Sequence, residues 1–225
     1  ALEKRENIYL FIPNIIGYVR ILAGLAAFWF SEEWKVFFWC YWVSYFLDCF
    51  DGAAARKFNQ ATRFGQMLDM VTDRCSSACL FALLAKLYPG PLGFACYFML
   101  ALDLASHYCI VYSQLLQGTA SHKKMGDDTN WLLKIYYHNQ VVLFLCCLFN
   151  ETFFVMAYLY FHCTLPSSPA AFYLPIVTVV GYVCAPGMVL KQYLNILQLM
   201  TGCRRISEFD VFNRASLREE AAKAK

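Results

Sequence analysis

Four aspartates lie at regular spacings in a part of the chain that is otherwise hydrophobic enough to enter a bilayer. They are Asp48, Asp51, Asp69 and Asp73. At about 100° per residue, the first two share one helical face and the last two share a face of a second helix, after a polar break around 57–61. A hairpin about this break brings all four to a similar depth, roughly 13 to 20 Å below the turn. The spacing therefore predicts a cluster of four carboxylates.

Such a cluster needs cations between its members. Arg56 adds one positive charge nearby, so about −3 remains in a low-dielectric setting where unpaired ions are costly. Oxygen ligands favour Mg²⁺, Mn²⁺ or Ca²⁺ over zinc, and two pairs of carboxylates suit two ions. We expect a site for two divalent ions, Mg²⁺ or Mn²⁺, held by the four aspartates.

Small residues on the same helical faces indicate what such a site would act on. Gly52, Ala55 and Gly65 remove side-chain bulk beside the carboxylates, so a planar or phosphorylated ligand can approach the helices closely. Two divalent ions at this face suit a pyrophosphate, whose leaving phosphate they stabilise during in-line displacement. One carboxylate should also take a proton from the attacking hydroxyl, and Asp73, the deepest on its helix, is the candidate base.

The composition indicates which kind of protein holds this motif. Of the 225 residues, 60% are hydrophobic and 18% are aromatic, and the mean hydropathy is +0.43. These values are typical of a multi-pass membrane protein. The net charge of +3 is small and the basic residues are scattered, which argues against a nucleic-acid partner.

The apolar runs predict an all-α bundle of six transmembrane helices in residues 1–203, followed by a charged C-terminal tail, 204–225. The expected spans are roughly 8–30, 36–56, 62–88, 92–116, 140–161 and 171–200. Most lysines and arginines of the loops and termini lie on one side of the predicted spans, and the positive-inside rule makes that side cytosolic. Both termini and the opening of a polar, metal-binding cavity are therefore expected on the cytosolic side. Arg20, deep in the first span, needs an anionic partner, either the carboxylate cluster or a substrate phosphate.

The motif as a whole resembles the signature of a known family. Written D-x2-D-G-x2-A-R-x8-G-x3-D-x3-D, it is similar, without gap or substitution, to that of the CDP-alcohol phosphotransferases. The resemblance implies that the first three aspartates bind metal and that Asp73 both touches metal and acts as the base. It also implies that the CDP moiety of the donor is lined by Gly52, Ala55, Arg56 and Gly65. Thr62, on the same face, is a further candidate to hydrogen-bond the nucleotide or its phosphate.

Similarity beyond the motif bears on the acceptor alcohol. The segments PNIIGYVR, MLDMVTDR, DLASH, SHK and KIYY resemble the eukaryotic branch of the family that uses inositol. That resemblance implies transfer of the phosphatidyl group of CDP-diacylglycerol to myo-inositol with release of CMP, by a homodimer in the endoplasmic reticulum membrane. The polar groups that it makes available to the polyol are Asp103, His107, His122, Lys123 and Tyr137.

Alternatives stay open for these acceptor residues and for the function. Asp103 and His107, at i and i+4, could satisfy each other in the bilayer, and His122 and Lys123 could be a solvated loop on anionic lipid. Serine or glycerophosphate could replace inositol, because the family shares the motif. A cation transporter would also use buried aspartates, but no inverted repeat or matched pair of broken helices is evident. A purely structural protein would have no reason to hold four carboxylates at one depth.

Overall fold

Long apolar stretches fold into helices throughout the described chain. The computed structural model describes residues 6–119 and 130–223, and no strand occurs within these ranges. The long helices of this part are α1 Ile12–Trp29, α2 Trp34–Lys57, α3 Arg63–Leu87, α4 Pro91–Thr119, α6 Gln140–Thr164 and α7 Leu174–Lys223. The shorter elements are α5 Trp131–His138 and two 3-10 turns, η1 Ile8–Leu10 and η2 Pro169–Tyr173.

The connection between α2 and α3 reverses the chain near Gln60, as predicted from the sequence, although the two helices pack against α1 more closely than against each other. Just after α2, Asn59 takes a positive φ of 52°, a conformation that asparagine tolerates better than most residues. Thr62 then caps α3, and its hydroxyl oxygen accepts a hydrogen bond from the Gly65 backbone N–H at 3.0 Å. The side-chain oxygen of Gln60 accepts from the Ile12 N–H at 2.9 Å, which ties the turn to the start of α1.

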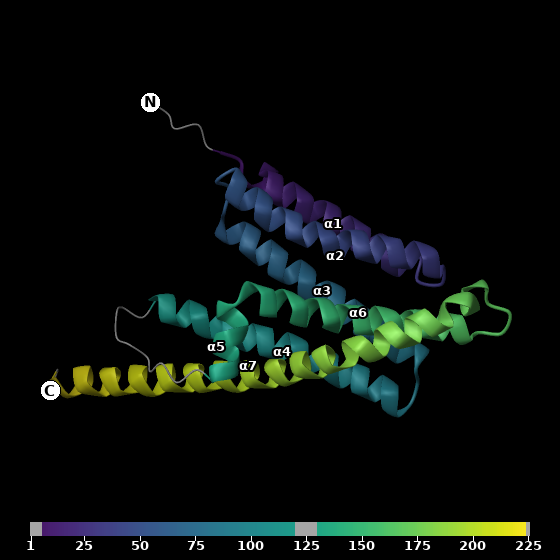
Figure 1. The fold of residues 1–225 in the computed structure, drawn as a ribbon. Coiled ribbons are helices and arrows are strands. Elements are labelled where there is room, and N and C mark those ends of the chain that lie inside the picture. The colour runs from purple at the N-terminus through teal and green to yellow at the C-terminus, as the bar shows by residue number, and fades with distance from the viewer. Residues whose placement is uncertain (1–5, 120–129, 224–225) are drawn as a thin grey trace.

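The helices form a bundle in which α3 joins the N-terminal helices to the rest. α1 packs against α2 and α3, α3 packs against α4 and α6, and α7 packs against α4 and α6. The α2–α3 connection, α5 and the C-terminal part of α7 lie at one end of the bundle (Figure 1). The α1–α2, α3–α4 and α6–α7 connections lie at the other end.

A hydrophobic core occupies the part of the bundle away from the hairpin. Phe37 of α2 and Tyr158 of α6 are fully buried, with ring centroids 4.0 Å apart, and Leu84 of α3 belongs to the same cluster. Within a bilayer, such close packing stabilises the bundle more than the hydrophobic effect does, because lipid tails are as apolar as the side chains. The core therefore fixes the positions of α2, α3 and α6 relative to one another.

Four described stretches are long and apolar enough to cross a membrane: α1, Pro91–Leu116 of α4, α6, and Pro169–Lys223, which includes α7. α2 and α3 carry the charged motif and are not among them. An all-α membrane protein is thus confirmed, while the number of six spans stays a prediction. The predicted C-terminal tail continues α7 as a helix to Lys223, and the 50 residues of α7 extend about 75 Å.

Candidate active site

The four motif aspartates converge on one guanidinium group. α2 presents Asp48 and Asp51, α3 presents Asp69 and Asp73, and the buried side chain of Arg20 from α1 lies between them. Nη1 of Arg20 lies 2.6 Å from Asp51 Oδ2 and 2.7 Å from Asp69 Oδ1. Nη2 lies 2.6 Å from Asp48 Oδ1 and 2.6 Å from Asp73 Oδ1. Of the two anionic partners expected for Arg20, the carboxylate cluster is the one in contact.

The donor set of this cluster fits divalent cations. Asp48, Asp51 and Asp69 each offer a carboxylate oxygen, and these atoms all lie within 4.8 Å of one another. One guanidinium cannot balance four carboxylates, and Arg20 contacts one oxygen of each, so further oxygens can serve as ligands. Clusters of oxygen ligands suit hard ions such as Mg²⁺ or Mn²⁺. Three of the four predicted ligands, Asp48, Asp51 and Asp69, therefore fit a metal site, while the part of Asp73 and the number of ions stay predictions.

A cavity of about 260 Å³ borders Asp51 and Asp69. It is lined by all five residues predicted to contact the CDP moiety: Gly52, Ala55, Arg56, Thr62 and Gly65. Gly65 lets Asn14 of α1 lie close to the start of α3, because a Cβ at this position would lie only 3.0 Å from Asn14 Oδ1. α3 begins after Thr62, and the unpaired N–H groups of a helix start attract phosphate. The cavity thus combines small residues, an arginine and a helix N-terminus beside two carboxylates.

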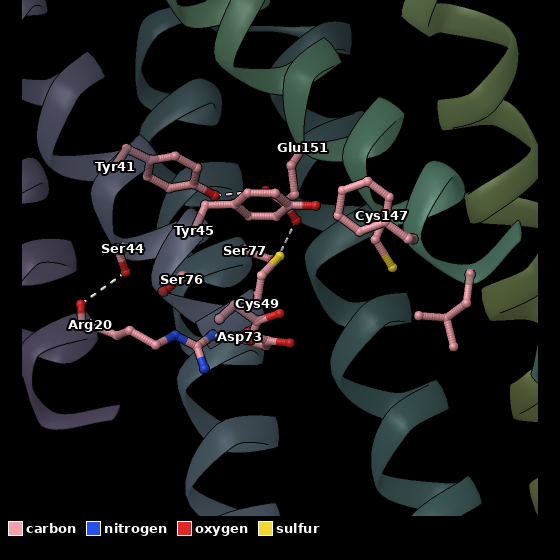
Figure 2. A pocket seen from close by; sticks show the side chains of 13 residues that line it. Arg20, Tyr41, Ser44, Tyr45, Cys49, Asp73, Ser76, Ser77, Cys147 and Glu151 are labelled. Atoms are coloured by element: carbon pink, nitrogen blue, oxygen red, sulfur yellow. Dashed lines mark hydrogen bonds and ion pairs between the residues drawn. The ribbon is translucent and has the colours of Figure 1, made fainter. Parts of the chain in front are cut away.

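A second cavity, of about 120 Å³, borders the other two aspartates, Asp48 and Asp73. Its lining is rich in hydroxyl groups, which belong to Tyr41, Ser44, Tyr45, Ser76 and Ser77. Figure 2 shows Glu151 of α6 at the upper edge of this cavity and Asp73 at its lower edge, with tyrosine and serine hydroxyls near Glu151. The carboxylate cluster therefore borders both cavities, with a different pair of aspartates facing each.

Glu151 of α6 and Lys191 of α7 are buried ionisable side chains outside the predicted site residues. Both stand within apolar runs, where a charged residue is itself a signal of function. Lys191 Nζ donates to Asn195 Oδ1 at 2.6 Å in the interior of the bundle. A charged residue within an apolar run can be seen in the sequence. Neither residue belongs to a spacing pattern, however, so the sequence does not predict which side chains it would contact.

Asp103 and His107, predicted to contact the acceptor, lie in a polar network behind the cluster. Arg74 Nη1 donates to both carboxylate oxygens of Asp103 at 2.9 Å, and its Nη2 lies 3.7 Å from Asp73 Oδ2. His107 Nδ1 lies 2.8 Å from the Asp103 backbone oxygen and 3.6 Å from its Oδ1. The expected contact between Asp103 and His107 exists, but Arg74 is the closer partner of the carboxylate.

Tyr137, a third predicted acceptor residue, lies elsewhere. Its hydroxyl accepts a hydrogen bond from Gln198 Nε2 at 2.6 Å, and it lines a cavity of about 740 Å³ between α4, α5 and α7. None of the three described candidates lines the cavity beside Asp73. His122 and Lys123 lie outside the described residues.

The fold and the site define a helical membrane protein that holds a carboxylate cluster between two polar cavities. The chain belongs to the CDP-alcohol phosphatidyltransferase family, whose sequence profile matches residues 10–166.

Relatives named CDP-diacylglycerol–inositol 3-phosphatidyltransferase resemble the chain over nearly its whole length. The protein from Schizosaccharomyces pombe is 39% identical over 96% of this chain and 97% of its own. The protein from Homo sapiens is 40% identical over 93% of this chain and 97% of its own. That from Drosophila melanogaster is 35% identical over 98% of this chain and 96% of its own. No solved structure matches the chain.

Proposed function

We propose that this chain transfers the phosphatidyl group of CDP-diacylglycerol to myo-inositol and releases CMP. The observation that carries the proposal is the division of the aspartates between two cavities. Asp51 and Asp69 face a cavity built for a nucleotide, and Asp48 and Asp73 face a cavity lined by hydroxyl groups. A donor and an acceptor held on different sides of one cluster can meet in line at a phosphorus atom between them. The names of the relatives support the same reaction.

The donor occupies the cavity of about 260 Å³. Arg56 and the N-terminus of α3 bind its pyrophosphate, Thr62 hydrogen-bonds the nucleotide or its phosphate, and the glycines and Ala55 let it lie against the helices. The four aspartates would hold two Mg²⁺ or Mn²⁺ ions, and three of them, Asp48, Asp51 and Asp69, already place carboxylate oxygens within 4.8 Å of one another. Such ions would supply positive charge to the pyrophosphate oxygens and the leaving phosphate.

The acceptor enters the cavity beside Asp73. A hydroxyl of inositol attacks the phosphorus that bears diacylglycerol, and Asp73 accepts the hydroxyl proton as the new oxygen–phosphorus bond forms. The bond from that phosphorus to the oxygen bridging to CMP breaks, and CMP leaves. Asp103 supports this step from behind, because it holds Arg74, whose Nη2 lies 3.7 Å from Asp73 Oδ2.

The orientation of the protein follows from its charges. Lys57, Arg63, Lys134, Arg204 and Arg205 belong to the end of the bundle that carries the α2–α3 connection. By the positive-inside rule this end is cytosolic, so the donor cavity, which reaches Gln60 and Thr62, opens to the cytosol. We place the six-span domain, residues 1–203, in the endoplasmic reticulum membrane as a homodimer, with both termini and residues 204–225 in the cytosol.

One assay separates this function from the alternatives. The purified protein is reconstituted into sealed vesicles with CDP-diacylglycerol and Mg²⁺ or Mn²⁺, and CMP release is measured with inositol, serine or glycerophosphate. We expect release that depends on inositol. Release with another alcohol alone would replace the acceptor in the proposal. Cation flux without any CMP release would favour a transporter and overturn the enzymatic function.

A further inference from the structure

A buried carboxylate outside the motif faces the cavity beside Asp73. Glu151 has 8% of its surface exposed, although it lies in α6, a mostly apolar helix. Tyr41 donates its hydroxyl to Glu151 Oε2 at 2.7 Å, and Ser77 donates to Oε1 at 2.8 Å. Figure 2 shows both bonds at the edge of the cavity. Each oxygen accepts one hydroxyl donor, and a carboxylate oxygen has room for a second.

Glu151 forms no ion pair with any described lysine, arginine or histidine. Among the thirteen described residues that line the cavity, Arg20 is the one cation. Its Nη1 and Nη2 are already in contact with the four motif aspartates, so it cannot serve Glu151 as well. Arg74 and Lys191 attract Glu151 only from beyond ion-pair distance. Both of its oxygens accept a hydroxyl hydrogen, which is the bonding pattern of an ionised carboxylate. A carboxylate buried without a close counter-ion is costly, and a site keeps one where a bound ligand uses it.

The rest of the lining is matched to hydroxyl groups. Tyr45, Ser44 and Ser76 join Tyr41 and Ser77 around the same space, and each hydroxyl can both donate and accept a hydrogen bond. A polyol offers the complementary set, since every one of its hydroxyls also donates and accepts. An alcohol that carries phosphate or carboxylate would instead bring a second negative charge next to Glu151, with no cation on that wall to receive it.

We propose, on the basis of the transfer reaction proposed above, that Glu151 selects the acceptor by charge. Its carboxylate accepts hydrogen bonds from hydroxyls of an uncharged polyol and excludes anionic alcohols from the space beside Asp73. Tyr41 and Ser77 fix the orientation of the carboxylate from α2 and α3, so that its remaining lone pairs point to the cavity. Glu151 is therefore a specificity-determining residue that contacts the acceptor, while the motif aspartates serve the transfer itself.

The test compares Glu151→Gln with wild type in KM for inositol, KM for CDP-diacylglycerol and the inhibition constant of inositol monophosphate. We expect KM for inositol to rise about tenfold to a hundredfold through loss of a charged hydrogen-bond acceptor, with KM for the donor within about twofold. Inositol monophosphate should inhibit the variant at about tenfold lower concentration than wild type. Unchanged values for both inositol and its phosphate would overturn the proposal.

Two further variants keep the test decisive. Tyr41→Phe removes one bond to Glu151 but keeps its charge, so KM for inositol should rise while inositol monophosphate stays excluded. Should Glu151→Gln fail to fold, Tyr41→Phe still tests the proposal. Inhibition of this variant by inositol monophosphate at concentrations similar to its KM for inositol would overturn selection by charge. Glu208→Gln removes an exposed carboxylate of α7 and should change none of these values.

A binding measurement separates this proposal from the proposed function. Equilibrium binding of radiolabelled inositol to the detergent-purified protein is measured without donor, in wild type and Glu151→Gln. Weaker binding in the variant supports the subsite whether or not CMP is released. CMP release combined with equal binding in both proteins overturns the role of Glu151 and leaves the transfer reaction in place. Absence of inositol binding to wild type overturns the subsite.

Discussion

Nη2 of Arg20 lies 2.6 Å from Oδ1 of Asp73, and the same guanidinium contacts the other three motif aspartates. A single side chain of α1 thereby joins both helices of the α2–α3 hairpin. Ser44 of α2 strengthens the link, because its hydroxyl donates to the Arg20 backbone oxygen at 2.9 Å. The first helix therefore stabilises the cluster in addition to crossing the membrane.

Removing this guanidinium should destabilise the protein. We expect Arg20→Gln to lower the free energy of unfolding by about 2 to 3 kcal/mol. This loss is at or below the low end of what breaking a fully buried ion pair costs. The reduction arises because Asp48, Asp69 and Asp73 are 36 to 45% exposed and solvent screens part of their repulsion. Thermal unfolding in detergent with EDTA measures the loss, and Mg²⁺ should restore more stability to the variant than to wild type. Arg63→Gln, at an exposed position, is the control, and equal melting temperatures in EDTA would contradict the expectation.

Metal removal should abolish transfer. Because the carboxylate oxygens of Asp48, Asp51 and Asp69 lie within 4.8 Å of one another, EDTA should stop CMP release, and added Mg²⁺ or Mn²⁺ should restore it. Asp48→Asn or Asp69→Asn should lower both bound metal and turnover. Asp210→Asn, an exposed carboxylate of α7, should lower neither. Full activity in excess chelator would exclude the metal site.

Filling the donor cavity should block the nucleotide. Gly52 lines the cavity of about 260 Å³, and a Cβ there would lie 3.6 Å from Arg56 Nη1, so a longer side chain must extend into the same space. We expect Gly52→Leu to fold but to weaken CDP-diacylglycerol binding at least tenfold. Ala53→Leu, at the next and exposed position, should bind donor normally. Normal donor binding by a folded Gly52→Leu protein would place the pocket elsewhere.

Neutralising the proposed base should slow chemistry more than binding. Asp73→Asn keeps the size of the side chain but removes its basicity, so kcat should fall by a factor on the order of 10² to 10⁴. Donor affinity should stay within about tenfold. Part of the loss can come from weaker metal binding, so metal content is measured in the same variant. Inositol-dependent CMP release at the wild-type rate would remove Asp73 from the mechanism.

The placement of the aspartates on two helical faces, at matching distances from the turn, was determined by the sequence alone. Helical periodicity decides which residues share a face, and equal distances from a turn decide which residues meet across a hairpin. Asp51 and Asp69 stand nine residues on either side of Gln60, and both contact Arg20 Nη1. Gly52, Ala55, Thr62 and Gly65 lie on the same two faces and line the cavity beside these aspartates, whereas Arg56 was expected there only from the resemblance to the family.

The contacts between helices distant in sequence were decided by the tertiary structure. Arg20 had two possible anionic partners in the sequence, and the packing of α1 on α2 and α3 brought it to the aspartates. Asp103 had His107 as its local neighbour on the same helix face, but Arg74 of α3 reaches its carboxylate at 2.9 Å.

Glu151 shows most plainly why such contacts cannot be read from local patterns. Its partners Ser77 and Tyr41 are 74 and 110 residues away along the chain, and they meet it because α6 packs beside α2 and α3. Periodicity specifies a direction relative to one helix axis, whereas a contact also depends on how that axis is placed and rotated against its neighbours. The sequence by itself thus determined which carboxylates and small residues share the two helical faces, and only the packing of α6 decided what faces Asp73 across the second cavity.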